Sequence, residues 1–259
     1  MSLVMWLVFG AIAGGIAKWV MPGRCPEGWV PTIGLGIIGS LASIAFFVGV
    51  RAKNSALSAA TLTNLRDIGV AAELWKGEHQ GYFIPAWDKS TNSSYAQTLD
   101  PYIHGVESFR NVKSKFIGPD KRLEVKVNAN SHPITYSLNM GVCRDITPKG
   151  DYTAKLIHSS QVDRLNEVIL LADGCQNPGN LNQANSAAYR IFYQIGETGP
   201  VGQFSQPIPV GPDVDTNAVD GWFRYPFGKC HALMCDGSAR AFPKGTIQKR
   251  NLWIDTVRN

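Results

Sequence analysis

The first fifty residues contain two long apolar runs separated by a short turn. Residues 1–17 carry no charged side chain, and residues 28–50 form a second run of 23 residues without a charge. A helix needs about 20 apolar residues to cross a bilayer, so each run approaches or reaches that length. The intervening residues 22–28 are too rich in Pro and Gly to remain helical. The pattern therefore predicts a transmembrane hairpin of two helices over residues 1–50.

The second apolar run continues into an amphipathic pattern with no helix breaker between them. One face of the predicted helix collects residues spaced three and four apart: Leu57, Thr61, Leu65, Ile68, Ala72 and Trp75. Most of the polar residues occupy the other side, namely Asn64, Arg66, Asp67, Glu73 and Lys76. We predict one long helix from about residue 31 to residue 76. The segment 51–80 is assigned to the amphipathic helix that continues the second span.

The remaining residues, 81–259, alternate short apolar segments with turns and loops. Six segments rich in β-branched or apolar residues are predicted strands: 123–127, 134–139, 168–173, 190–195, 230–235 and 239–242. Asp236 and Gly237 lie between the last two and predict a tight hairpin turn, which requires positive φ. Several Pro and Gly residues make 201–221 a loop. The expected fold class is α+β, with the long helix packed on an antiparallel sheet.

Charge is distributed very unevenly along the chain. Only Lys18, Arg24 and Glu27 are charged among the first fifty residues, although the whole chain is 17% charged with a net charge of +5. This split indicates a membrane segment joined to a soluble domain, with the lipid bilayer as partner. The basic stretch 113–126 has few aromatic residues for stacking bases, so no nucleic-acid partner is expected.

Glycines recur in both predicted spans. Gly10 and Gly14 in the first, and Gly36 in the second, would let two helix backbones approach closely in lipid. Glycine is also simply common in membrane helices, so both interpretations remain open. The stretch 34–39 matches the dinucleotide-binding pattern GxGxxG, but no acidic residue that could bind a ribose follows before Arg66. We therefore do not expect nucleotide binding there.

The N-terminal motifs carry a family resemblance. Residues 6–18, the Met-Pro-Gly-Arg of residues 21–24 and the glycine-rich stretch 32–39 resemble the small membrane proteins called transglycosylase-associated proteins. The similarity covers about residues 1–45. Members of that family are short three-span proteins often linked to stress, whereas this chain has no third apolar run after the second. The resemblance implies a membrane anchor and no transglycosylase chemistry.

A second resemblance covers residues 54–245. The Gly-Tyr-Phe-Ile-Pro of residues 81–85 and the segments 134–139, 168–173 and 230–242 are similar, in order, to bacterial type IV pilins and type II secretion pseudopilin-like proteins. This resemblance implies a pilin-like fold and a structural role with other pilin-like subunits or secretion-system proteins. The family's leader, with its Glu at the start of the apolar helix, is absent, which argues against prepilin-peptidase cleavage and conventional filament assembly. A histidine that the family carries at the place of Pro226 is also absent.

Few residues form a recognisable chemical site. Cys143, Cys175, Cys230 and Cys235 could form disulfides in an exported domain, in any of three pairings, or remain buried free thiols. On a strand, residues 230 and 235 point to opposite faces, so a zinc site that includes His231 is not expected. The sequence shows no nucleophile–base pair at a known spacing. We therefore expect a protein that is not an enzyme.

One loop contains residues of the type that bind hard cations. Four oxygen-bearing side chains lie within eight residues: Asp213, Asp215, Asn217 and Asp220. Weak calcium binding is one interpretation, and a solvated acidic turn, which we favour, is the other.

These observations lead to a hypothesis for location and function. The chain is expected to be a non-catalytic, pseudopilin-like assembly protein of the bacterial cell envelope, with two spans in the inner membrane. The basic residues flanking the spans are nearly balanced, so the resemblance to exported pseudopilins places the C-terminal domain outside the cytoplasm. The alternative is a stress-type small membrane protein whose extracytoplasmic domain senses or binds a ligand.

Overall fold

The computed structural model describes two separate parts of the chain. The described residues are 8, 10–12, 16, 29–88, 90–104, 115–119, 134–139, 141–144, 156–174, 190–191, 203–208, 210 and 223–254. The chain divides into two compact units, residues 1–56 and residues 57–259. The predicted strand at 123–127 and the acidic loop at 213–220 lie outside the described residues.

The longest element is helix α2, Trp29–Glu78, with 50 residues. Its one proline, Pro31, lies in the first turn, where a missing N–H breaks no intrahelical hydrogen bond. The helix ends where Gln80 and Gly81 adopt positive φ and the Gly81 N–H donates back to the Lys76 carbonyl at 2.9 Å. The single long helix predicted over residues 31–76 is confirmed.

The first unit contains the apolar part of α2. Large apolar side chains between residues 36 and 50 are exposed, including Ile38, Phe46, Phe47 and Val48. Within the part of the chain that the structure describes, the stretch Gly36–Glu78 is the one helix long and apolar enough to cross a membrane. The predicted two-helix hairpin is not confirmed, because most of residues 1–28 lie outside the described residues.

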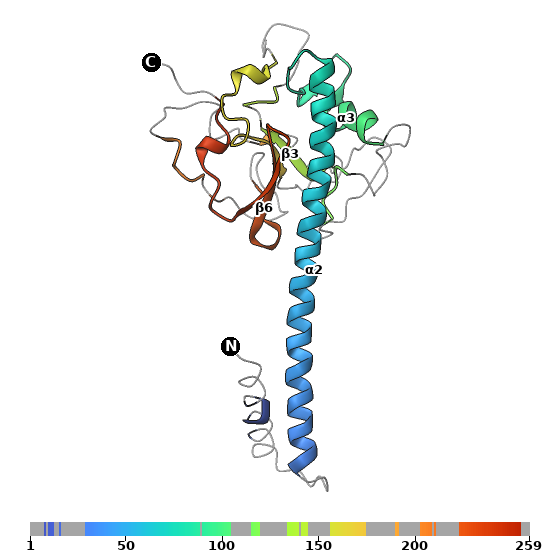
Figure 1. Cartoon of the computed structure of the whole chain (residues 1–259), viewed down its shortest axis with the longest axis vertical. Coiled ribbons are helices and arrows are strands. Elements are labelled where there is room, and N and C mark those ends of the chain that lie inside the picture. Colours follow the sequence, from blue (N-terminus) through green and yellow to red (C-terminus); the bar gives the residue numbers. More distant parts are fainter. Residues whose placement is uncertain are drawn as a thin grey trace. The chain divides into compact units, whose positions relative to one another are not determined.

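Among the described residues, the second unit contains a five-stranded sheet with the strand order β5-β3-β4-β6-β7. Figure 1 labels β3 and β6 of this sheet. Its strands are β3 Tyr136–Asn139, β4 Ile169–Asp173, β5 Arg190–Ile191, β6 Lys229–Met234 and β7 Ala239–Pro243. The antiparallel pairing is confirmed for β3–β4, β4–β6 and β6–β7. It is wrong for β5, which pairs with β3 in parallel. Parallel neighbours require a long crossover, and some fifty residues separate these two strands.

Helix α3, Tyr95–His104, was not predicted from the sequence. It follows a short hairpin of β1 (Trp87–Asp88) and β2 (Ser93–Ser94) and contains Pro101, a residue that disfavours a helix interior. Tertiary contacts compensate for it. Tyr95 is fully buried and donates its hydroxyl to the Tyr136 carbonyl of β3 at 2.6 Å.

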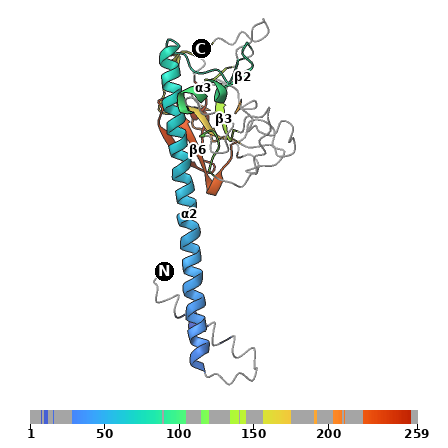
Figure 2. The same cartoon turned by 90° about the vertical axis from the view of Figure 1, so that its right-hand side faces the viewer.

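The core of the second unit comprises two clusters that share strands β4 and β6. On β6, Ala232 and Met234 belong to one cluster, whereas Leu233 belongs to the other. This alternation follows from the two-residue period of a strand, which sends successive side chains to opposite faces. The first cluster includes the buried face of α2, and both views show this part of the helix lying along the sheet (Figures 1 and 2). Its α2 members are Leu65, Ile68, Ala71, Ala72 and Trp75.

At Gly69 the backbone of α2 comes close to the β6–β7 hairpin. A Cβ placed on Gly69 would lie 2.8 Å from Leu233 Cδ1 and 3.2 Å from the Gly237 carbonyl oxygen. Gly237 itself has φ of 81° and lies with Asp236 in the turn between the two strands. A residue without a side chain at position 69 therefore lets the helix contact this turn.

Candidate functional site

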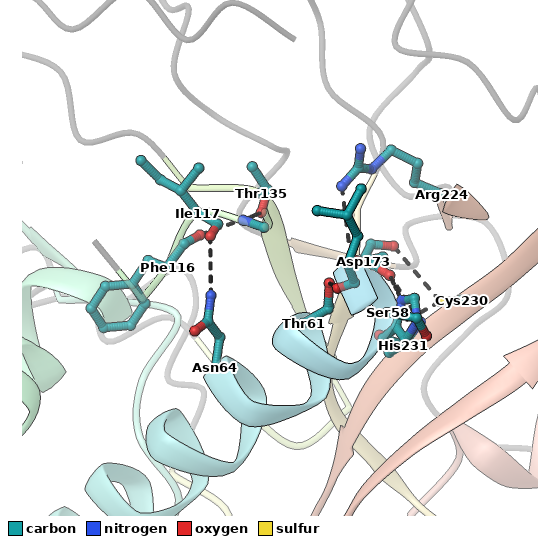
Figure 3. Close-up of polar contacts among 12 residues, drawn as sticks. Ser58, Thr61, Asn64, Phe116, Ile117, Thr135, Asp173, Arg224, Cys230 and His231 are labelled. Atoms are coloured by element: carbon teal, nitrogen blue, oxygen red, sulfur yellow. Dashed lines mark hydrogen bonds and ion pairs between the residues drawn. The ribbon is translucent and has the colours of Figure 1, made fainter. Parts of the chain in front are cut away.

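Three polar residues of α2, spaced three apart, face the sheet or the segment that contains Ile117 (Figure 3). They are Ser58, Thr61 and Asn64. The Thr61 hydroxyl donates to the Leu57 carbonyl within the helix at 2.9 Å, so its polar atom is satisfied although the residue is only 4% exposed. Asn64 Nδ2 donates to the Ile117 carbonyl at 3.3 Å. Asn64, predicted on the outward side of the helix, is thus half-buried and in contact with another segment.

Ser58 begins a hydrogen-bonded chain of three side chains from three elements. Its Oγ lies 2.6 Å from His231 Nε2 on β6, and His231 Nδ1 lies 2.7 Å from Asp173 Oδ2 on β4. A carboxylate only accepts hydrogen bonds, so in the neutral ring Nδ1 carries the proton and donates to Asp173. Nε2 is then the acceptor for the Ser58 hydroxyl. Figure 3 shows the three side chains pointing toward one another.

Asp173 is held in this chain by further contacts. Its Oδ2 also accepts from the His231 backbone N–H at 2.9 Å, and its Oδ1 lies 3.8 Å from Arg224 Nη2. The side chains of Asp173 and His231 are each 1% exposed. A charge this deeply buried requires paired and hydrogen-bonded neighbours, which Arg224 and His231 supply. Burial first, and the nearby Asp173 carboxylate second, raise the pKa of Tyr136, so its phenol stays neutral beside this charge.

The chain Ser58–His231–Asp173 has the distances and order of a serine nucleophile, a base and an orienting carboxylate. Acyl transfer also requires N–H donors directed at the developing oxyanion. Ser58 lies deep within α2, where backbone N–H groups are bonded to carbonyls four residues earlier and are not free to serve as such donors. The imidazole is almost fully buried as well. The arrangement is therefore suited to attaching the helix to the sheet.

Sequence reasoning did not identify this chain of residues. Positions 58, 173 and 231 lie far apart along the sequence, so no motif spacing could connect them. Two features of the sequence could have indicated it. Asp173 lies at the end of an otherwise apolar strand, and His231 lies within the apolar strand β6. A charged or titratable residue in such a strand requires a partner across the sheet or on a covering helix.

The residues predicted from the sequence lie elsewhere. In the first unit, a Cβ placed on Gly10 would lie 3.0 Å from the Gly36 carbonyl oxygen and would collide with Ser40 Oγ, so the two backbones come close there. Asp236 accepts from the Ser238 N–H in the hairpin turn at 2.9 Å. The remaining candidates lie outside the described residues: Gly14, Asp213, Asp215, Asn217 and Asp220.

The described cysteines are buried free thiols. These are Cys143, Cys230 and Cys235, whereas Cys175 lies outside the described residues. Cys230 and Cys235 belong to different core clusters, so their thiols face opposite sides of the sheet. Burial raises the pKa of the Cys143 and Cys235 thiols, which keeps them protonated and unreactive. Among the residues that the structure describes, no three His, Cys, Asp or Glu side chains are placed to hold a metal ion.

Comparison with known proteins finds relatives for the N-terminal segment. Over 41 residues, 16% of this chain, it is 49% identical to the UPF0410 protein YeaQ of Escherichia coli (strain K12). Over the same length it is 49% identical to the UPF0410 protein YmgE of Escherichia coli O127:H6 and 46% identical to that of strain K12. This segment is similar to UPF0410 proteins. The chain spans about half the length of these curated relatives.

The comparisons reach no further along the chain. No family model matches it, and no solved structure gives a significant match. Nothing in them supports the resemblance of residues 54–245 to pseudopilins. The similarity to UPF0410 proteins and the exposed apolar stretch of α2 together indicate a membrane-associated protein.

Proposed function

We propose that the chain is a membrane-anchored, non-catalytic protein of a bacterial cell envelope that carries a folded head, residues 57–259. One observation carries this proposal: α2 is apolar and exposed over residues 36–50, whereas its buried face further along packs against a sheet. An exposed apolar helix surface of this length is suited to lipid rather than water.

Paired substitutions test the anchor. Replacing both Ile38 and Leu41 with Asp puts two charges near the middle of the proposed span, at a cost of about 2.5–3.5 kcal/mol each. This variant is expected to leave the membrane fraction on alkaline carbonate extraction, whereas the wild-type chain remains. Val70 and Leu74 are exposed apolar residues of the head, so the same change there is the matched control and should not release the protein. Equal extraction of both double variants would contradict the proposal.

The finer topology that we propose has two spans and an extracytoplasmic head. The close approach of Gly10 to Gly36 supports a helical pair in the anchor, and the resemblance to exported pseudopilins supports the orientation. Protease added to intact spheroplasts is expected to digest the head, and protease added to inverted vesicles is expected to leave it intact. The reverse pattern would place the head in the cytoplasm.

For the head we propose a pseudopilin-like structural or assembly role, with other pilin-like subunits or secretion-system proteins as partners. The order of motifs over residues 54–245 and the amphipathic continuation of the apolar helix support it. The alternative, a ligand-sensing or binding domain on a small membrane protein, is favoured by the similarity of the anchor to UPF0410 proteins. Cross-linking and pull-down from membranes separate the two: secretion-system subunits support the first, and cell-wall or small-molecule ligands the second.

The proposed absence of catalysis has its own test at Ser58. A fluorophosphonate probe reacts with serines activated by a neighbouring base. It is expected to leave Ser58 unlabelled because the backbone N–H groups next to Ser58 are engaged in the hydrogen bonds of α2 and are not free to bind an oxyanion. Peptide mass spectrometry of the treated full-length protein measures this directly. Labelling at Ser58 that disappears in the His231→Ala variant would show that the residue is an activated nucleophile.

Calcium binding by the acidic loop 213–220 remains a prediction, and the solvated turn remains the favoured interpretation. If the loop binds calcium, the full-length protein melts at a higher temperature in calcium than in chelator. An unchanged melting temperature would eliminate the calcium hypothesis.

A further inference from the structure

The face that α2 presents to the sheet changes character along the helix. From Leu65 to Trp75 this face is apolar and buried, and every side chain on it is at most 7% exposed. Between Ser58 and Asn64 the same face carries three polar residues together with the half-buried Leu62, and Ser58 and Asn64 are themselves only half-buried. One end of the packed helix thus depends in part on hydrogen bonds, whereas the other depends on apolar contacts.

Water can replace the contacts at the polar end at little cost. Ser58 bonds His231 Nε2, and Asn64 bonds the Ile117 carbonyl, so each lost bond can be exchanged for one to water. At the apolar end water cannot replace the lost contacts, because separating Leu65 and Ile68 from the core exposes hydrocarbon to water. Opening should therefore begin at the polar end and stop near Leu65.

The sheet side of the polar contact keeps its shape when the helix leaves. Asp173 holds the His231 ring through Nδ1 and also accepts from the His231 backbone N–H, and neither bond involves α2. The imidazole therefore stays oriented, with Nε2 ready to accept again from Ser58. A preorganised acceptor favours rapid reattachment.

We propose that residues 57–64 of α2 form a releasable latch, which detaches from the sheet while the helix beyond residue 64 stays packed. When the latch is released, about 12 Å of α2 no longer contacts the sheet, because its eight residues each rise about 1.5 Å along the helix axis. This segment begins at the division between the two units of the chain. The latch is thus a conformational device that sets how much of α2 belongs to the head.

Cysteine accessibility in the full-length protein, in mild detergent, tests the latch. Thr61→Cys places a thiol at the buried face of the latch, and Ala72→Cys places one on the apolar part of the same face. Maleimide labelling, read by peptide mass spectrometry to separate the native cysteines, is expected to be about tenfold faster at position 61. Adding Ser58→Ala should increase the rate at position 61 by roughly fivefold and leave position 72 unchanged, because only the latch loses a hydrogen bond.

A control and a second probe keep the test decisive. Thr63→Ala removes an exposed hydroxyl that donates to the Ala59 carbonyl of its own helix, and it should change neither rate. If Thr61→Cys does not fold, Leu57→Cys probes the same segment from a half-buried position. Equal maleimide labelling rates at positions 61 and 72 would show that the helix separates from the sheet only on global unfolding. An equal change of both rates in Ser58→Ala would show the same. Either result would overturn the latch. The labelling rates do not depend on lipid, so a negative result for the latch does not contradict the proposed membrane anchor.

Discussion

The close contact between α2 and the β6–β7 hairpin makes a quantitative prediction at Gly69. Replacing Gly69 with Ala adds a methyl group 2.8 Å from Leu233 Cδ1 and 3.2 Å from the Gly237 carbonyl oxygen. Leu233 is fully buried and Gly237 is backbone in a tight turn, so neither can yield freely. Overpacking of this kind costs about 1–3 kcal/mol. Alanine also has the higher helix propensity, which recovers up to about 1 kcal/mol.

Gly77 supplies the matched control within the same helix. A Cβ at Gly77 would have no atom within 4 Å, so Gly77→Ala retains the propensity gain without the collision. The propensity terms largely cancel in the comparison, and Gly69→Ala is expected to be less stable than Gly77→Ala by about 1–3 kcal/mol. The free energy of unfolding of each full-length variant is measured by urea titration in mild detergent. Tryptophan fluorescence is a suitable signal, because Trp75 and Trp253 are buried.

The outcome tests how the helix is placed on the sheet. If both alanine variants are stabilised by the same amount, the helix does not approach the hairpin as closely as the structure shows. A destabilised Gly77→Ala with an unchanged Gly69→Ala would reverse the order and refute the reasoning altogether.

Three further predictions concern the head. Gly237→Ala should lower stability by about 1–2 kcal/mol in a thermal melt, because its φ of 81° strains any residue with a Cβ, and Gly237→Asn should cost less. Burial raises the pKa of Cys143 and Cys235, so the folded state keeps protons that unfolded thiols lose. The free energy of unfolding should therefore fall above about pH 8.5, by roughly 1.4 kcal/mol per pH unit for each buried thiol. Cys143→Ala should make this decrease with pH less steep. The hydrogen bond from Arg250 lowers the pKa of Glu167, so this stabilisation is present above about pH 4.3 and is lost as pH falls through the lowered value. Arg250→Met should reduce this acid-side dependence of the melting temperature, and the ion pair with Arg164 should retain part of it.

Sequence patterns predicted an element correctly where the pattern lay within one continuous segment. The long helix was predictable because no helix breaker separates its apolar run from its amphipathic face. The pairing of β6 with β7 was predictable from two apolar segments joined by Asp236 and Gly237. Helix α3 was missed because Pro101 disfavours a helix locally, whereas burial of residues such as Tyr95 and Leu99 stabilises it in the fold.

The sequence by itself determined which parts of the chain are apolar, helical or extended, since propensity and periodicity are properties of neighbouring residues. Only the tertiary structure decided which side chains meet. It brought Ser58, Asp173 and His231 together from a helix and two strands, placed Gly69 against the hairpin turn, and set β5 parallel to β3. Such contacts depend on how the elements pack in three dimensions, and no short-range pattern in one chain records the distance between residues more than fifty positions apart.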